Sequence, residues 1–332
     1  MKCFYVYKMV KTDLVKIPLP GLGIDKVNLY VVENKYLIDA GFYNIVSFHE
    51  LIRKLRSINI RLCDIEAVLI THFHVDHLSL APILKDFCEP DFYIGDIELK
   101  LLRDGADLFV KNILEEFIRQ GVPETEIKRI VDSHPVMRLA EIYKRDIKEI
   151  SFKNVSDGDE IDNFIEVVST PGHTPGSISY KIEDFIFSGD SVLPTITPSV
   201  IYNRYSENPL KDHLNTLRKI ISINPKAIYP GHGDVINDPV SRAEELIEFH
   251  KNRLEEILKF LNRNDYSLYE ITKLIKWRVR YNIWEEFPYP ERFFALGEAL
   301  AHLIYLRSEG LVDYYEKNGM IYWYSKARRD IK

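Results

Sequence analysis

The chain has 332 residues, an apolar fraction of 46%, a charged fraction of 28% and a formal net charge of −6 at pH 7. This length allows two domains, the composition is that of a soluble globular protein, and the negative charge argues against a surface built as a whole for polyanions. No uncharged apolar run reaches membrane-spanning length and no signal peptide is evident, so we expect a cytoplasmic protein. The odd, sparse cysteines Cys3, Cys63 and Cys88 predict no disulfide framework.

The N-terminal region predicts strands followed by a helix. Apolar runs over residues 27–32 and 36–38 flank Glu33-Asn34-Lys35, which is typical of a hairpin turn. Asp39 follows this hairpin. We favour a turn-capping role for its side chain, with the alternative that it accepts a hydrogen bond from a metal-bound histidine. Helical spacing then predicts a helix over residues 45–58, and the apolar run 65–70 predicts a buried strand.

The segment after this strand holds four candidate metal ligands within six residues, His72, His74, Asp76 and His77. A tight loop after a strand can aim alternate side chains at one point. Neutral imidazoles and carboxylates are the ligands that borderline divalent metals prefer. Packing does not explain such a cluster, because His and Asp lose solvation when they are buried without partners. The segment therefore predicts a metal site.

Three fragments farther along the chain each place a His or Asp after a short apolar run that predicts a strand. They are Thr170–Gly176 with His173, Phe187–Asp190 with Asp190, and Tyr229–Gly233 with His232. Each contains glycine, which lets the backbone turn tightly. We interpret His134, which lies outside these fragments, as a non-ligand.

Taken in order, the fragments resemble the metallo-β-lactamase superfamily, whose signature is H-x-H-x-D-H followed by His, Asp and His; the resemblance covers roughly the first 240 residues. It implies an α+β fold, the αββα metallo-β-lactamase sandwich, with the site at one edge of the two sheets. It also implies two divalent metal ions, zinc in first place, with iron or manganese as alternatives. One ion would bind His72, His74 and His173; the other would bind Asp76, His77 and His232, with Asp190 bridging.

Such a pair of ions would ionise a shared water near neutral pH, and the metal-bridging hydroxide would attack a substrate whose carbonyl or phosphoryl oxygen contacts one metal. In the catalytic roles that the resemblance implies, Asp76 orients the hydroxide and Asp190 fixes the metal spacing.

The sequence also departs from some relatives. His74 stands where oxygen-reducing diiron relatives carry Glu, Asp190 where resistance-conferring zinc β-lactamases carry Cys, and Leu193 where quorum lactonases place Tyr. These departures favour hydrolysis and argue against those three activities, while a persulfide-oxidising branch that keeps the first motif stays an alternative.

Residues 96–150 interrupt the β-rich pattern with apolar residues at helical spacing. Gly121 suits a helix end and Pro123 the start of the next helix. Two interpretations remain open for this helical insertion: it covers the sandwich, or it forms a lid that gives the metal cleft an apolar wall.

From about residue 241 to residue 332 the chain is mostly helical. Ser267 and Glu270 form a capping-box pattern, and Asn318-Gly319 predicts a hairpin. Three helices and a hairpin resemble a winged-helix domain, which also accompanies a superfamily branch that includes endoribonucleases. Residues 251–332 carry 15 Lys and Arg against 12 Asp and Glu. Because this excess is small, a structural or dimer-forming role is at least as well supported as nucleic-acid binding.

The leading hypothesis is a dinuclear metallohydrolase of a small ester, thioester or lactone, with a catalytic domain over residues 1–240 and a winged-helix-like domain over 241–332. The alternative is a metal-dependent endoribonuclease or phosphodiesterase whose winged-helix domain aids RNA binding. A hypothesis of another class is a nucleic-acid-binding module with a vestigial metal site, using Lys276, Arg278 and Arg280. We disfavour it because every ligand position is filled.

Overall fold

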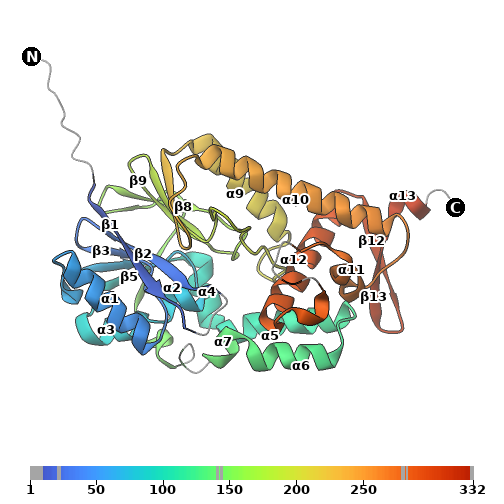
Figure 1. The fold of residues 1–332 in the computed structure, drawn as a ribbon, viewed down its shortest axis with the longest axis horizontal. Coiled ribbons are helices and arrows are strands. Elements are labelled where there is room, and N and C mark those ends of the chain that lie inside the picture. Colours follow the sequence, from blue (N-terminus) through green and yellow to red (C-terminus); the bar gives the residue numbers. More distant parts are fainter. Residues whose placement is uncertain are drawn as a thin grey trace, which may run out of the picture.

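The computed structural model describes residues 10–20, 24–139, 142, 145–277, 281 and 283–329 (Figure 1). Its first sheet has six strands in sequential order: β1 (Thr12–Pro18), β2 (Lys26–Val32), β3 (Tyr36–Ile38), β4 (Ala67–Leu69), β5 (Asp91–Gly95) and β6 (Phe152–Val155). The first three strands pair antiparallel and the last four pair parallel. The predicted hairpin between β2 and β3 is confirmed, with Glu33 and Asn34 at positive φ.

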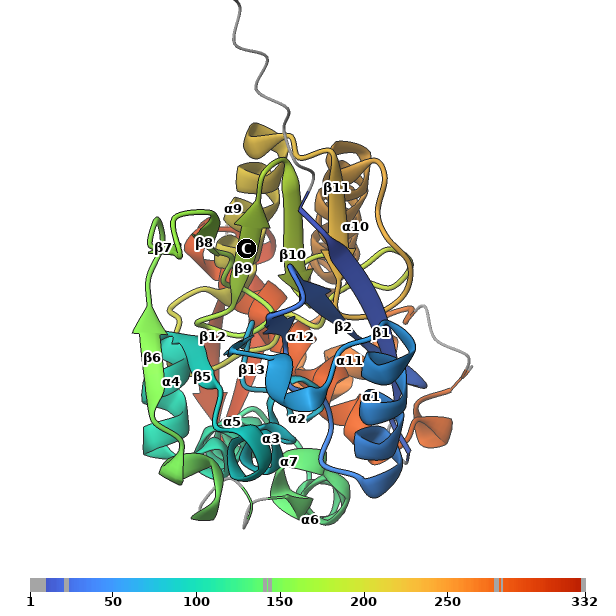
Figure 2. The ribbon, with the colours of Figure 1, turned by 90° about the vertical axis from the view of Figure 1, so that its left-hand side faces the viewer.

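The second sheet has five strands in the order β11-β10-β9-β8-β7. Their bounds are β7 (Glu160–Ile161), β8 (Ile165–Ser169), β9 (Ile178–Ile182), β10 (Phe185–Gly189) and β11 (Ala227–Pro230). The apolar runs that precede His173, Asp190 and His232 correspond to β8, β10 and β11, as predicted. Figure 2 shows this sheet beside the first one.

Alternation along the strands divides the core into layers. In β2, Leu29 and Val31 belong to one apolar cluster, whereas Tyr30 and Val32 belong to another that also contains Tyr180 and Phe187 of the second sheet. Successive strand side chains point to opposite faces, so β2 is buried on both. The cluster that contains Tyr30 therefore joins the two sheets.

Helices cover the outer faces of the sheets. The helices α1 (Ile45–Ser57) and α3 (Ala81–Cys88) contribute Leu51, Leu55 and Leu84 to the cluster on the outer face of the first sheet. A third cluster joins the second sheet to α9 (Pro209–Ile223) and α10 (Pro239–Leu261). The predicted α1 is confirmed, with Asn44 as its N-cap.

In the insertion, the described residues form the helices α4 (Asp96–Asp104), α5 (Ala106–Arg119), α6 (Glu124–Ser133) and α7 (Pro135–Arg138). A short 3-10 helix, Ile147–Glu149, follows. The helices α5 and α6 pack against the C-terminal elements, and Trp323 Nε1 donates to Gln120 Oε1 at 2.8 Å. The insertion thus contacts the first sheet through α4 and the C-terminal elements through α5 and α6, which lie below α11 and α12 in Figure 1.

The C-terminal elements follow the predicted order. After α10 come α11 (Leu268–Leu274), a 3-10 helix (Trp284–Glu286), α12 (Tyr289–Ser308), the hairpin β12 (Val312–Lys317) and β13 (Met320–Ser325), and α13 (Lys326–Arg329). The capping box and the Asn318-Gly319 hairpin are confirmed. The winged-helix assignment stays a prediction, and Arg278 and Arg280 lie outside the described residues. Among the helices that the structure describes, none is both long and apolar enough to cross a bilayer.

The cysteine prediction was wrong, because Cys63 and Cys88 form a disulfide with their Cα atoms 4.9 Å apart. Composition could not reveal this pairing, since the fold brings together a 3-10 turn (Leu62–Asp64) and the end of α3. The loop that this disulfide closes, between Cys63 and Cys88, contains the whole His72–His77 motif. Disulfides are rare in the cytosol of mesophiles but common inside hyperthermophiles.

We expect reduction of this disulfide, or Cys63→Ser, to lower the free energy of unfolding by about 3 kcal/mol, because the cross-link restricts a loop of 25 residues in the unfolded chain. Thermal unfolding with and without reductant measures the effect. Reductant should not lower the melting temperature of Cys63→Ser further. An equal melting temperature for the oxidised and reduced wild type would contradict the prediction.

Candidate metal centre

The seven predicted ligands come together where strands of both sheets end. His72 and His74 follow β4, while Asp76 and His77 lie on the short helix α2 (Val75–Leu78). The second sheet supplies the rest from the loops after β8, β10 and β11. The ligand atoms form three overlapping groups, within each of which they lie within 4.8 Å of one another: His72, His74 and His173; His72, His77 and Asp190; Asp76, His77 and His232.

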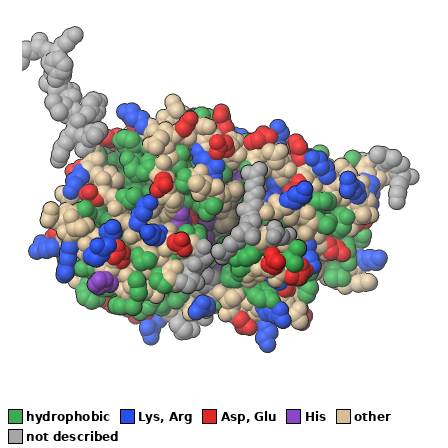
Figure 3. Space-filling view, in the orientation of Figure 1, with side chains coloured by type: hydrophobic (Ala, Val, Ile, Leu, Met, Phe, Trp, Pro, Cys, Tyr) green, Lys and Arg blue, Asp and Glu red, His purple; other side chains and the backbone are tan. Residues whose placement is uncertain are grey.

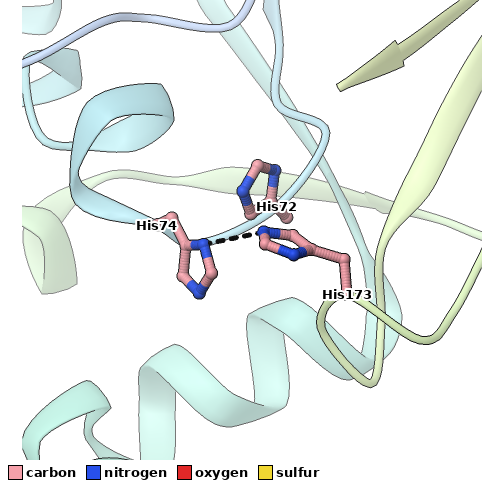
Figure 4. A group of neighbouring side chains, drawn as sticks. All are labelled: His72, His74 and His173. Carbon is pink, nitrogen blue, oxygen red and sulfur yellow. Dashed lines mark hydrogen bonds between the residues drawn. The ribbon is translucent and has the colours of Figure 1, made fainter. Parts of the chain in front are cut away.

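The first group is composed of three imidazoles (Figure 4). The His74 Nδ1 and His173 Nε2 atoms are 2.9 Å apart. The other ring nitrogen of His173 donates to the Ser199 carbonyl at 3.0 Å, which leaves Nε2 as the unprotonated nitrogen. His72 Nδ1 contacts the Thr71 hydroxyl at 2.9 Å, and its buried Nε2 has no hydrogen-bond partner. The group therefore directs nitrogen lone pairs at one point.

The second group combines imidazoles with carboxylates. His232 Nδ1 donates to the Lys26 carbonyl at 2.7 Å, and its Nε2 lies 3.1 Å from Asp76 Oδ2. His77 Nε2 lies 3.5 Å from Asp190 Oδ1, a buried oxygen without a hydrogen-bond partner. Asp190 Oδ2 approaches both His173 and His232, at 3.7 and 3.4 Å. Asp190 thus stands between the two groups.

The favoured role for Asp39 was wrong. Its buried carboxylate accepts hydrogen bonds from His77 Nδ1 at 2.7 Å and from the Thr71 N–H at 2.8 Å, and it also contacts the Thr71 hydroxyl. It therefore orients His77 directly and His72 through Thr71, the alternative role considered above. Turn chemistry alone could not distinguish the two, because the partners lie more than 30 residues away in the chain.

The electrostatics of the site favour cations. Burial lowers the pKa of His72 well below its ordinary value and that of His74 to about 3, so both rings are neutral. Burial opposes protonation of His77 and His232 too, but nearby carboxylates, Asp190 most strongly, raise the pKa of His77 well above its usual range and that of His232 to about 10. The surplus of negative charge around His77 and His232 stabilises a positive charge at their Nε2 atoms, whether a proton or a metal ion supplies that charge.

One glycine shows how tightly the site is built. A Cβ on Gly231 would lie 2.4 Å from Asp190 Oδ1 and 2.6 Å from His77 Cε1. Any larger residue would displace both side chains. The Gly that precedes His232 is therefore required by close approach.

Sequence reasoning missed Glu98, which lies in the first turn of α4 and is fully buried. Its Oε2 accepts from the Phe73 N–H at 2.8 Å, and its Oε1 accepts from the Thr174 hydroxyl at 2.7 Å and the Gly176 N–H at 2.9 Å. Glu98 thus joins the loop of His72 and His74 to the loop of His173. Burial raises its pKa to about 7, and the donated hydrogen bonds oppose this rise.

We expect Asp39→Asn to lower the affinity for a divalent metal by about 10- to 100-fold, because an amide no longer accepts the His77 N–H as a charged partner. Competition with a chelator of known affinity measures the change. Asp132→Asn, at an exposed position of α6, is the matched control. Equal metal affinities for the two variants would show that Asp39 does not support the site.

A second prediction concerns Glu98→Gln. Both oxygens of Glu98 accept hydrogen bonds, so in either orientation of the glutamine amide its NH₂ group faces an N–H or O–H donor. We expect the free energy of unfolding to fall by about 1–3 kcal/mol. We also expect metal binding by the His72, His74 and His173 group to weaken. Denaturant unfolding and the absorption spectrum of the cobalt-loaded protein measure the two effects. An unchanged cobalt spectrum would show that Glu98 does not position the His72, His74 and His173 group.

Comparison with known proteins agrees with this geometry. The family model described as the metallo-beta-lactamase superfamily matches residues 22–232. The chain is similar to the probable metallo-hydrolase YqjP of Bacillus subtilis, with 24% identity over 96% of this chain and 100% of that protein. It also resembles the crystal structure of the metallo-beta-lactamase family protein TTHA1429 of Thermus thermophilus, with a TM-score of 0.77, 25% identity and coverage of 95% and 98% of the two chains.

A shorter match is to an atrochrysone carboxyl ACP thioesterase of Aspergillus fumigatus, 31% identical over 28% of each chain. The chain belongs to the metallo-β-lactamase superfamily. It has the mixed α/β fold of that family and is an enzyme of the metallo-hydrolase class.

Proposed function

We propose that the seven side chains bind two divalent metal ions and that the enzyme hydrolyses a thioester or a related activated ester or lactone. The observation that carries the proposal is the orientation of the ligand atoms. Four imidazoles have one nitrogen engaged by Thr71, Asp39, Lys26 or Ser199, and the other nitrogen faces its partners in the cluster. An anchored imidazole with a free second nitrogen is the usual arrangement of a metal ligand.

The donor set supports two positions for the metals. His72, His74 and His173 offer three nitrogens, whereas Asp76, His77 and His232 add a carboxylate. Asp190 has one oxygen near His77 and the other near His173 and His232, which suits a shared ligand. Zinc accepts such mixed nitrogen and oxygen ligands, and iron or manganese is compatible with them.

When bound, the metals would lower the pKa of a coordinated water towards 7 and polarise the carbonyl of the substrate. The protein residues hold the geometry for this reaction. Burial opposes ionisation of Asp76 and Asp190, but neighbouring imidazoles outweigh it. They hold the pKa of Asp76 at about 2 and that of Asp190 well below its usual value, so both carboxylates remain ionised. Asp76 can accept the hydrogen bond that orients the attacking water. In thioester hydrolysis the C–S bond breaks and the water oxygen enters the carboxylate. One proton of the water leaves with the thiol, and the other is released to solvent.

Exposed apolar side chains in the segment after β3 support an acyl substrate. The segment after β3 joins the centre through its backbone, since the Ala40 N–H donates to the His77 carbonyl at 2.7 Å. Farther along this segment Tyr43, Ile45 and Val46 are exposed, Ile45 by 77%. Exposed apolar side chains in a segment that begins at the polar centre can contact the hydrocarbon part of an ester. The similarity to a thioesterase over part of the chain supports the same substrate class.

A second candidate is a single-strand-specific ribonuclease that uses the same metals. It is favoured by the β12–β13 hairpin, where the Tyr315 and Tyr322 rings stack and the Arg329 guanidinium lies 3.6 Å from the centre of the Tyr324 ring. Aromatic and cationic side chains together can stack with unpaired bases. This candidate would use the C-terminal elements as a winged-helix-like RNA-binding unit.

A screen of the metal-loaded protein against thioesters, lactones, phosphodiesters and single-stranded RNA tests both candidates. We expect thioester hydrolysis that a chelator abolishes and that Asp190→Ala reduces by more than about 100-fold, since this change removes a ligand shared by both metals. Cleavage of RNA without thioester hydrolysis would favour the ribonuclease. Thioester hydrolysis that Asp190→Ala leaves intact would contradict the proposed site.

A further inference from the structure

A cleft with basic walls shares one residue, Lys26, with the surroundings of the candidate metal centre. It has a volume of about 480 Å³ and lies between α1 and the paired ends of β1 and β2. Its lining combines cationic side chains with apolar ones and one carboxylate: Leu14, Lys16, Pro18, Lys26, Glu50, Arg53 and Lys54. The volume lies within the range of small-molecule sites. Neither the ligand cluster nor the proposed hydrolysis uses these side chains.

The charge of the cleft is positive after its internal ion pairs are taken into account. Arg53 forms a two-pronged pair with Glu50 at 2.6 and 2.7 Å, and Lys16 lies 3.0 Å from Asp234. Within the described part of the chain, no carboxylate forms an ion pair with Lys26 or Lys54. The two ammonium groups therefore remain available to an anion, and the cleft keeps two positive charges.

Lys26 connects this cleft to the metal centre. Its backbone carbonyl accepts the hydrogen bond of His232, and its side chain lines the cleft. The path from the far side of the His232 ring to the Lys26 ammonium is on the order of 15 Å at full extension. In Figure 3, Lys and Arg side chains gather over α1, β1 and β2, on the same face as the hollow in which His side chains are visible.

We propose that this cleft binds the phosphate groups of a phosphorylated thiol carrier while the attached thioester reaches the metal centre. The proposal rests on the proposed function and specifies its substrate class. Two ammonium groups suit a phosphate, and the Leu14 and Pro18 side chains offer apolar contact to the organic part of the carrier. A pantetheine arm has a reach comparable to the path along Lys26. The carrier is either a free nucleotide-linked thiol or a phosphopantetheine arm on a protein, which share the phosphate.

Direct binding tests the cleft independently of catalysis. The probe is S-methyl coenzyme A, whose capped thiol cannot act as a thiolate ligand, and S-methyl pantetheine is its phosphate-free match. Calorimetry on the full chain is expected to show saturable binding of the first probe to wild type and to Asp190→Ala. The Lys26→Met/Lys54→Met variant should bind at least about tenfold more weakly. The control Lys100→Met/Lys128→Met, which removes two exposed lysines outside the cleft, should bind as wild type does.

Kinetics then relate the cleft to the reaction. With one acyl group on coenzyme A and on pantetheine, kcat/KM should favour the phosphorylated substrate by at least about tenfold, and this preference should disappear in Lys26→Met/Lys54→Met. A further comparison, with the acyl group on a phosphopantetheinylated carrier protein, distinguishes the two carriers.

The possible failures are distinguishable. Lys-dependent binding without hydrolysis of any thioester would overturn the proposed function and leave the anion site intact. Hydrolysis with equal kcat/KM for both thioesters, together with binding that the lysine substitutions leave unchanged, would overturn the cleft proposal alone. Single-stranded RNA could also displace the probe at a lower concentration than coenzyme A does. That result would assign the cleft to nucleic acid and would also overturn the cleft proposal.

Discussion

The rest of the site depends on one constraint, which is that several carboxylates are clustered among buried imidazoles. Asp39, Asp76 and Asp190 lie close to His77, and burial makes each of these groups costly unless a partner compensates it. Hydrogen bonds to Thr71, to backbone carbonyls and to one another satisfy the outward-facing atoms. The inward-facing atoms converge on one another, so folding alone brings the candidate ligands together.

The architecture holds this arrangement by using both sheets. The first sheet supplies the His72–His77 loop, and the second supplies His173, Asp190 and His232 from three strand ends. Glu98 contributes from a third direction, because it lies on α4 and receives hydrogen bonds from both ligand loops. The insertion is therefore part of the framework of the site, in addition to its packing against α12.

The sequence was sufficient to predict that the seven candidate ligands lie together and to predict most strands, because the signals for these features are local: alternating apolar residues, Gly-flanked turns and clustered His and Asp. What it could not provide depends on contacts distant in the chain. The carbonyls of Lys26 and Ser199 anchor ligands, yet any residue has a carbonyl, so no side chain marks them. Asp39 and Glu98 act through partners that only the fold brings near. The Cys63–Cys88 pair likewise depends on how α3 returns to the 3-10 turn.

The measurement that tests the central claim most directly is the metal content of active protein, determined by elemental analysis after removal of loosely bound ions. The account predicts two divalent ions per chain in wild type, because two groups of ligands share Asp190. A catalytically active preparation with fewer than one ion per chain would contradict it.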